Sequence, residues 1–406
     1  MLWYIVGVVL FALGIAVSIA LHEFGHLLTA KAFGMKVTRY FIGFGPKLFS
    51  FRKGETEYGL KLIPAGGFCE IVGMTALEEV PKADAPRAFY AQKTWKRVIV
   101  LAAGSITHFI VGFLILLIAA VSTGLPTVKP VVGSLSCANA RQDPKTLVDY
   151  TPCTPDVPAP AQAAGLRPND LIVAVGGKNT ATWQDAVDAI QHSRGKTPIT
   201  IERAGTQQTL TVDVATVQRV SPDAKQGQDN PLHEAGAIGM KPANNLRYTV
   251  GQAFPQAVSF TGMMFSNTWE GLKKLPAKLP AVVKAIMGDK QDPDRPVSVV
   301  GASRIGGEAA QAGIWWLFLL LLASLNFFVG VFNLLPLLPL DGGHIAVNLY
   351  ERVRDWLRKL RGRPAGAPVD YTRLLPLTYV VIFLGGAMVL LTVTADIVNP
   401  ITLSGQ

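Results

Sequence analysis

The hydrophobic residues of this chain gather in four long runs. The runs cover about 3–30, about 97–122, about 314–338 and about 374–397, and each is long enough to cross ~30 Å of hydrocarbon. Where no water is present, a helix is the structure that satisfies its own backbone hydrogen bonds. The pattern therefore predicts a polytopic α-helical membrane protein with about four transmembrane helices.

Short apolar stretches alternate with polar residues between the first two runs. They cover 40–46, 48–52 and 58–63, with a turn at Gly54 and the sequence PAGGF at 64–68. This alternation, interrupted by Gly and Pro, is typical of β-hairpins. A strand edge at membrane depth must be covered by protein or line a wet cavity, and it can pair with an extended peptide. A plain cytoplasmic loop is the alternative, because the alternation covers few residues.

The long stretch between the second and third runs has a different pattern. The sequence AGLRPNDLIVAVGGK at 164–178 predicts a turn, a strand and a Gly-Gly turn, followed by a helix at 183–192 and strands at 199–203 and 210–214. Residues of about 130–215 thereby resemble a PDZ domain, an α+β fold whose groove accepts a peptide as an added strand. A PDZ fold that binds nothing is the alternative.

Helical patterning returns at 250–288, where apolar side chains face several lysines. It predicts an outward amphipathic helix near the membrane surface, broken at Pro276 and Pro280. Residues 297–313 are mostly small and predict a link into the third run.

Composition and charge place these elements in a membrane. The chain is 50% hydrophobic, with a mean hydropathy of +0.32, which excludes an ordinary soluble protein. Segment 31–97 has twelve Lys and Arg against six acids, segment 350–373 has seven against three, and 125–310 has nineteen against sixteen. The positive-inside rule therefore puts both basic segments in the cytoplasm and the long balanced stretch outside. The net charge of +10 reflects this topology and anionic lipid headgroups, and no nucleic-acid partner is expected.

Two of the three cysteines lie in the outward stretch. Cys137 and Cys153 are predicted to pair in an oxidising compartment, while Cys69 lies alone in a cytoplasmic loop. We expect the first run not to be a signal peptide, because it has no basic beginning and no small-residue cleavage site. We expect it to be retained.

The first run contains the sequence HEFGH at 22–26. Positions four apart share a helix face, so His22 and His26 can present two imidazole nitrogens to one Zn²⁺, with Glu23 beside the reacting water. Polar groups within hydrocarbon are costly unless they have a function. The motif predicts a hydrolytic site in a membrane helix, and polar side chains packed within a helix bundle are the alternative.

A second motif, NLLPLLPLDGGH at 333–344, ends the third run. Pro336 and Pro339 remove backbone donors and should break the helix, which is tolerated at this depth only in a buried or wet site. We therefore expect Asp341 to be the third zinc ligand, leaving a fourth position to water. The alternatives are that Asp341 caps a helix and that His344 is only an interfacial residue, which we favour for His344.

His108 is a further polar residue at membrane depth, in the second run. It has three interpretations: a third metal ligand, a donor to the transition state, or a histidine satisfied within the bundle. Gly104, four residues earlier, predicts close packing of helices.

Together, HEFGH and NLLPLLPLDGGH around a PDZ-like outward domain resemble the site-2 protease family of zinc intramembrane proteases, specifically its bacterial members with one PDZ domain. The GFGP and PAGGF elements at 43–46 and 64–68 strengthen the resemblance. It implies one zinc held by His22, His26 and Asp341, with Glu23 as catalytic base. Many members have Asn where this chain has His108, so a transition-state or supporting role there is open.

The resemblance also implies how substrates bind. Asn333 would hold the substrate main chain, and the hairpin with Gly66, Gly67 and Phe68 would pair with an unwound substrate helix. The substrates would be single-span proteins already trimmed on their outer side, such as anti-sigma factors, cut by regulated intramembrane proteolysis. The protein would be multi-pass in the plasma membrane, or inner membrane, of a bacterium.

These patterns divide the chain into eight segments. They are a first span with the metal motif (1–33), a membrane-associated hairpin and interfacial loop (34–96), a second span (97–122), an extracytoplasmic region with the PDZ-like domain (123–250), an amphipathic helical region (251–313), a third span (314–345), a basic cytoplasmic loop (346–373) and a fourth span (374–398). A membrane receptor without catalysis and a zinc transporter are competing interpretations. A receptor would not need Glu23, and a transporter would not need a peptide groove.

Overall fold

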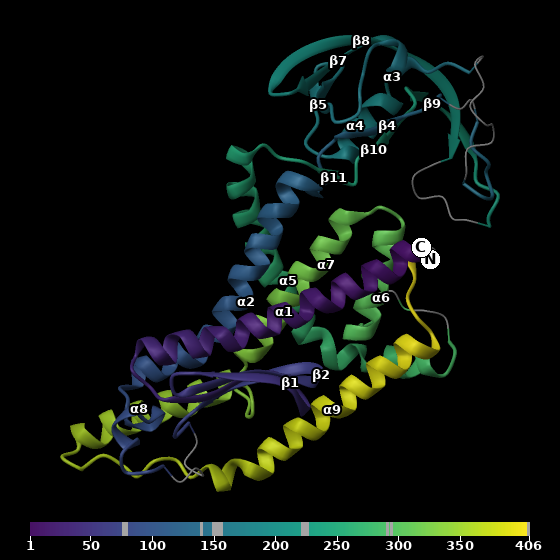
Figure 1. Cartoon of the computed structure of the whole chain (residues 1–406). Coiled ribbons are helices and arrows are strands. Elements are labelled where there is room, and N and C mark those ends of the chain that lie inside the picture. Colours follow the sequence, from purple (N-terminus) through teal and green to yellow (C-terminus); the bar gives the residue numbers. More distant parts are fainter. Residues whose placement is uncertain are drawn as a thin grey trace. The chain divides into compact units, whose positions relative to one another are not determined.

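The computed structural model describes residues 1–74, 80–138, 141–147, 157–220, 227–289, 292 and 295–403. The chain forms two compact units (Figure 1). Unit 1 comprises Met1–Val121 and Thr249–Gln406, and unit 2 comprises Ser122–Tyr248.

Four helices in the described residues are long and apolar enough to cross a membrane. They are α1 (Leu2–Ala32), α2 (Thr94–Ser122), α7 (Trp315–Asn333) and the 3-10 turn η3 (Tyr371–Leu374) continued by α9 (Leu375–Val398). The four predicted runs are thus helical. The third helix ends at Asn333, earlier than the predicted 338, because the prolines that follow cannot donate to the helix.

Small residues bring α1 against α6 (Val299–Gln311). A Cβ added at Gly7 would lie 2.5 Å from the Cβ of Ala310 and 2.9 Å from the Cα of Gly307. Phe11, fully buried, packs edge-on against Phe318 of α7. The segment predicted as a link is therefore a helix packed on the first span, since small residues let backbones approach closely.

Helix α5 (Val250–Ile286) is continuous, so the predicted break at Pro276 and Pro280 is wrong. The two prolines are four residues apart, and their missing donors interrupt one face of the helix only. The prediction that this helix lies at the membrane surface also describes only part of α5. Phe265 packs against Phe109 of α2 and Phe327 of α7, with ring centroids 4.8 and 5.3 Å apart, so this part of α5 belongs to the bundle.

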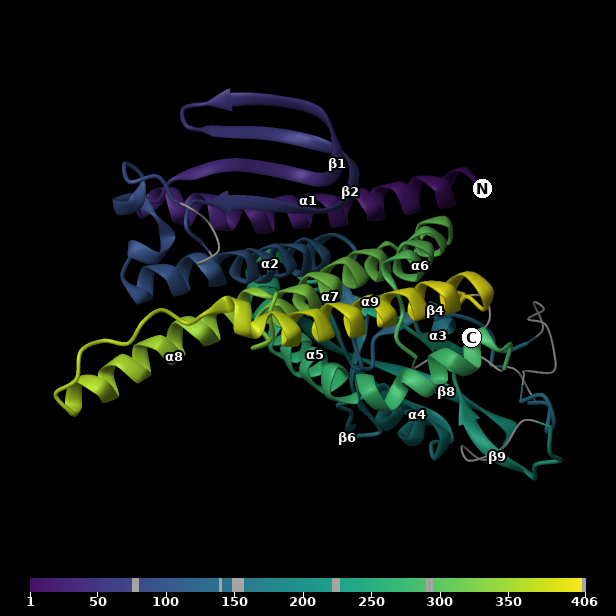
Figure 2. The same cartoon turned by 90° about the horizontal axis from the view of Figure 1, so that it is seen from below.

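Strands β1 (Val37–Lys53) and β2 (Thr56–Ile71) form the predicted hairpin, and a plain loop is excluded. Both strands are long and bent, so that Tyr40 lies opposite both Cys69 and Tyr58. The sheet lies beside α1 (Figure 2), where the hydroxyl of Tyr40 donates a hydrogen bond to the carbonyl of Ala20 at 2.8 Å. Two short 3-10 turns, η1 (Ala85–Arg87) and η2 (Phe89–Ala91), then lead to α2.

The segment after the second motif differs from its predicted structure. Residues 346–373 were predicted to be a basic loop, but α8 extends over Asp341–Leu360. Its apolar residues recur at helical spacing among the basic ones. An ion pair between Arg97 at the start of α2 and Glu351, with a nitrogen to oxygen distance of 3.6 Å, ties α8 to the bundle.

Unit 2 is built around a five-stranded sheet, in which the strands lie in the order β6 (Lys178–Asn179), β5 (Leu171–Val175), β7 (Gly195–Arg203), β8 (Thr206–Val220) and β9 (Leu232–Ala237). Its core includes Ile172, Ile199 and Val212. The predicted strands 199–203 and 210–214 lie within β7 and β8. The predicted helix at 183–192 corresponds to α4 (Trp183–Gln191), whose first turn is capped by reciprocal hydrogen bonds of Thr182 and Asp185. The elements are β3 (Leu125–Pro126), β4 (Val132–Leu135), α3 (Pro160–Ala163), β5 (Leu171–Val175), β6 (Lys178–Asn179), α4 (Trp183–Gln191), β7 (Gly195–Arg203), β8 (Thr206–Val220), β9 (Leu232–Ala237), β10 (Met240–Pro242) and β11 (Asn245–Leu246).

The predicted disulfide between Cys137 and Cys153 involves a residue outside the described ones. Cys153 falls in the interval between 147 and 157. The pairing therefore stays a prediction.

Candidate metal centre

Three side chains from opposite ends of the chain meet inside unit 1. His22 and His26 lie one turn apart on α1, and Asp341 is the first residue of α8. Both histidines are buried, and the Asp341 side chain is 16% exposed. Gly342 and Gly343 let the first turn of α8 lie against the backbone of Leu334 and Leu337, where an added Cβ would clash. This contact fixes the position of Asp341.

The donor atoms have the spacing of a tetrahedral metal site. The Nε2 atoms of His22 and His26 are 3.2 Å apart, and each lies 3.4 Å from Oδ2 of Asp341. Zinc bonds of about 2.0–2.1 Å in a tetrahedron put neighbouring ligands about 3.3–3.4 Å apart. Two nitrogens and one carboxylate oxygen are also a donor set that zinc accepts. The three residues therefore fit one zinc ion with a fourth position for water or substrate.

The surroundings orient the two imidazoles. The Nδ1 atom of His26 donates a hydrogen bond to the carbonyl of Val100 at 2.7 Å, so its Nε2 atom keeps a lone pair for the metal. The Nδ1 atom of His22 is buried without a hydrogen-bond partner among the described residues. A Cβ at Gly104 of α2 would lie 2.5 Å from both rings. Only glycine fits at this position.

Glu23 lies in the same small cavity, of about 170 Å³. Its carboxylate accepts a hydrogen bond from the backbone amide of Cys69 in β2. A Cβ at Gly67 would lie 2.9 Å from Cγ of Glu23, so a glycine is needed where β2 passes the carboxylate. Glu23 is thus held beside the three candidate ligands by the last part of β2.

The predicted hairpin residues lie at this edge of the sheet. Gly67 and Phe68 line the cavity, and Phe68 stacks on Phe41 with ring centroids 5.6 Å apart. Gly66 has a φ of +129°, a conformation that favours glycine, and an added Cβ would lie 2.5 Å from the ring of Phe44. Burial, assisted by the charge of Glu23, raises the pKa of Cys69 to about 12, so this thiol stays protonated.

Two residues of the second motif lie apart from the candidate ligands. Asn333, the last residue of α7, is half-buried and is absent from the described lining of the cavity. The ring of His344 stacks on Tyr371, with centroids 5.6 Å apart and Nδ1 3.4 Å from the hydroxyl. His344 therefore packs against Tyr371 from the first turn of α8, and its interfacial position stays a prediction.

His108 has a buried partner that the sequence did not reveal. Its Nδ1 atom lies 2.9 Å from Oδ1 of Asn326 in α7, and Nδ2 of Asn326 donates to the carbonyl of Leu322. Since Oδ1 can only accept, His108 donates, and its Nε2 atom carries a lone pair. The ring centroids of His108 and His22 are 5.0 Å apart. Asn326 is one of few polar residues in the apolar run of α7, which is the signal that would have identified it.

Comparison with known proteins decides the family. The model of peptidase family M50 matches residues 10–377. The chain belongs to this family, the site-2 protease family. The match confirms the resemblance drawn from HEFGH and NLLPLLPLDGGH.

Relatives of this M50 peptidase match most of its length. It is 45% identical over 406 residues to the zinc metalloprotease Rip1 of Mycobacterium tuberculosis (strain H37Rv), covering 98% of this chain and 99% of the relative. It is 44% identical over 407 residues to the protein of the same name in Mycolicibacterium smegmatis, covering 98% of each. A putative zinc metalloprotease of Neisseria meningitidis serogroup A is 28% identical over 442 residues, covering 89% and 92%.

The predicted enzyme class and cofactor are therefore confirmed. This M50 peptidase is a zinc-dependent metalloprotease with several apolar helices that suit a multi-pass membrane protein. The receptor and transporter interpretations are excluded.

Proposed function

We propose that this M50 peptidase is an intramembrane endopeptidase that cuts peptide bonds within the transmembrane segments of single-span proteins. The observation that carries the proposal is the triangle of donor atoms from His22, His26 and Asp341 beside Glu23, near the end of an apolar helix. We assign the three as zinc ligands and Glu23 as the catalytic base.

The chain's own groups divide the work of hydrolysis. When bound, zinc supplies a Lewis acid that polarises the scissile carbonyl and lowers the pKa of water. Glu23 takes a proton from the attacking water and returns it to the leaving amine. The backbone amide of Cys69 and the close passage of Gly67 keep its carboxylate in place. His108, oriented by Asn326 and next to His22, acts as a positioning residue for that ring.

Substrate binding is assigned to the strand edge at the cavity. A transmembrane helix hides its carbonyls in internal hydrogen bonds, so the substrate must unwind before it can be cut. Gly67 and Phe68 pair with Ile42 and Phe41 of β1 and also line the cavity, and Gly66 precedes them in β2. An unwound substrate segment would add there as a strand. Asn333, the last residue of α7, would hold the substrate main chain at a point outside the cavity.

We place the two basic segments in the cytoplasm and unit 2 outside the cell membrane, from the charge bias of the loops. A single cysteine at Lys196 of β7, in a protein without its native cysteines, should react with an impermeant reagent in intact cells. A cysteine at Arg361, which follows α8, should react only after lysis. The opposite pattern of labelling would invert the topology.

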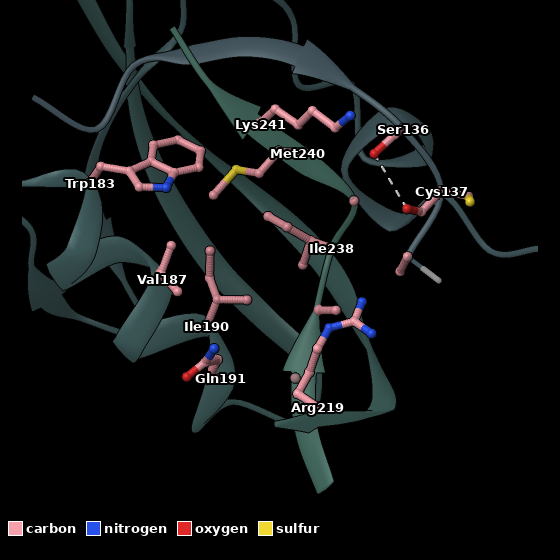
Figure 3. Close-up of a pocket in the computed structure, with 14 residues that line it drawn as sticks. Ser136, Cys137, Trp183, Val187, Ile190, Gln191, Arg219, Ile238, Met240 and Lys241 are labelled. Carbon is pink, nitrogen blue, oxygen red and sulfur yellow. Dashed lines mark hydrogen bonds between the residues drawn. The ribbon is translucent and has the colours of Figure 1, made fainter. Parts of the chain in front are cut away.

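We further propose that unit 2 is a PDZ-like gate that recognises trimmed substrates. A pocket of about 240 Å³ lies between α4 and the strand segment that follows β9 (Figure 3). Val187 and Ile190 face Ile238 and Met240 across it, while Arg219 and Lys241 add positive charge to its lining. An apolar cleft with cationic groups suits an extended peptide that ends in a carboxylate. Trimming of a substrate on its outer side would create such an end.

A comparison of membrane proteomes tests the proposed function. Cells with the Glu23→Ala enzyme should accumulate single-span proteins already shortened on their outer side, because the second cut is missing. Cells with Glu270→Ala, a change of an exposed glutamate on α5, should match the unaltered cells.

The same comparison tests the gate. Cells whose enzyme has residues 122–248 replaced by a short linker should cut single-span proteins that are still intact, if that enzyme keeps its zinc. Absence of stubs in the Glu23→Ala strain would contradict the proposed substrate class. A linker variant with full zinc that cuts nothing would show that unit 2 has a different role.

A further inference from the structure

A groove of about 720 Å³ lies between the beginning of α2 and the middle of α8, away from the metal centre. Its lining combines two basic residues, Lys93 and Arg352, with aliphatic side chains of both helices. The lining residues are Gln92, Lys93, Thr94, Trp95, Val98, Ile99, Leu349 and Arg352. The groove thus follows the point where α2 enters its apolar stretch.

The two cations of this groove have no acidic partner among the described residues. Lys93 and Arg352 are both exposed, while the neighbouring Arg97 is occupied by Glu351. Trp95, 52% exposed, lies beside them, and the ammonium of Lys96 lies 5.8 Å from its ring centroid. Exposed cations next to a tryptophan at the end of a membrane span are typical of the lipid headgroup region.

Helix α8 continues the same surface. One face is apolar and exposed, at 42–65% for each side chain, and comprises Leu349, Tyr350, Val353, Trp356, Leu357 and Leu360. At 3.6 residues per turn, Arg352 and Lys359 border this face on one side, and Arg354 and Arg361 border it on the other. A helix of this kind lies in the membrane interface, with its apolar face towards the acyl chains and its basic side chains reaching the headgroups.

We propose that the groove binds an anionic glycerophospholipid. Its phosphate lies between Lys93 and Arg352, and an acyl chain lies over Val98, Ile99 and Leu349. A lipid is the occupant that matches both parts of this lining, because a free phosphate would leave the aliphatic side chains uncovered. Basic pockets between membrane helices on the cytoplasmic side have the charge that anionic headgroups require.

The site gives the lipid an influence on the metal centre. Helix α8 is unbroken from Leu360 back to Asp341, so a lipid that holds α8 against α2 also holds the carboxylate near His22 and His26. This step rests on the proposed role of Asp341. The binding of the lipid itself does not.

Native mass spectrometry of the purified full chain in detergent tests the binding, with phosphatidylglycerol and phosphatidylcholine as probes. The unaltered chain should prefer phosphatidylglycerol. The Lys93→Ala/Arg352→Ala variant should bind it roughly 10–30-fold more weakly, since each basic side chain near an anionic surface contributes about fivefold. A Lys273→Ala/Lys274→Ala variant loses the same charge on α5 and should bind as the unaltered chain does. Equal binding by the first variant and the unaltered chain would overturn the proposal.

A second variant and a competitor identify the source of the phosphate. Leu349→Asn keeps both cations and should also weaken binding of phosphatidylglycerol, because the acyl chain loses its contact. Inorganic phosphate at millimolar concentration should not displace the lipid. Unchanged binding by Leu349→Asn, or displacement by phosphate, would assign the cations to a free anion and refute the lipid site.

Activity gives a separate readout of the influence on the metal centre. In bilayers of phosphatidylcholine, added phosphatidylglycerol should raise cleavage by the unaltered enzyme and not by Lys93→Ala/Arg352→Ala, with equal zinc in both. An equal response of both enzymes would refute the coupling through α8. If the unaltered enzyme cleaves no single-span substrate with or without phosphatidylglycerol, the proposed function is contradicted. The lipid binding measured by mass spectrometry is not affected by that result.

Discussion

An enzyme with Glu23→Gln will retain its zinc and cleave a single-span substrate about 10²- to 10⁴-fold more slowly than the unaltered enzyme. The amide has nearly the shape of the carboxylate and cannot take a proton from water. It can still accept the hydrogen bond that the amide of Cys69 donates to Glu23. Because Glu23 is not one of the three residues whose donor atoms meet, the metal should be unaffected. Zinc content per chain and the initial rate of cleavage measure the two properties separately.

The matched control for this variant is Glu270→Gln, an exposed glutamate paired with Lys273 on α5. It should have full zinc and full activity. Loss of zinc from the Glu23→Gln enzyme would make Glu23 a ligand. Retained activity with full zinc would remove it as the catalytic base.

Asp341→Ala should lose both zinc and activity. Its Oδ2 atom lies 3.4 Å from the donor nitrogens of both histidines, so its removal opens one vertex of the metal site. Zinc affinity should fall more than about 100-fold, since loss of a mere outer hydrogen-bonding partner typically costs 10–100-fold. Competition with a zinc chelator measures the affinity, and cleavage of the same substrate measures the activity.

Asp355→Ala changes a carboxylate of the same helix that pairs with Arg354, and it should leave zinc affinity unchanged. His108→Ala should also retain the metal, because His108 donates to Asn326 and supports His22 only by contact. Full zinc occupancy in Asp341→Ala together with loss in His108→Ala would move the third ligand from α8 to α2.

Local patterns were sufficient for the apolar helices and for the three residues whose donor atoms meet, His22, His26 and Asp341. HEFGH places its histidines on one helix face whatever the rest of the chain does, and the prolines after Asn333 end α7 by removing donors. The hairpin followed from alternation with Gly and Pro. Each of these features depends on neighbours in sequence, which a single chain displays directly.

The predictions are wrong or incomplete where tertiary packing determines the structure, or where charge and hydrophobic spacing indicate different structures. The seven basic residues of segment 350–373 favour a loop, although Leu349, Val353 and Trp356 recur at the helical spacing of α8, which ends at Leu360. The continuity of α5 through its prolines depends on packing against the bundle. The pairing of His108 with Asn326 joins residues of two helices, and no sequence spacing reports that contact.

The meeting of His26 and Asp341 has a consequence for the integrity of the protein. The two residues come from opposite ends of the chain, and the intervening sequence includes the whole of unit 2. With these two residues as ligands, as proposed above, a metal ion would connect α1 to α8 and restrict the separation of these helices as a covalent crosslink does. The free energy of zinc binding would then also stabilise the assembled helix bundle. A peptidase that loses its zinc would therefore lose stability as well as activity.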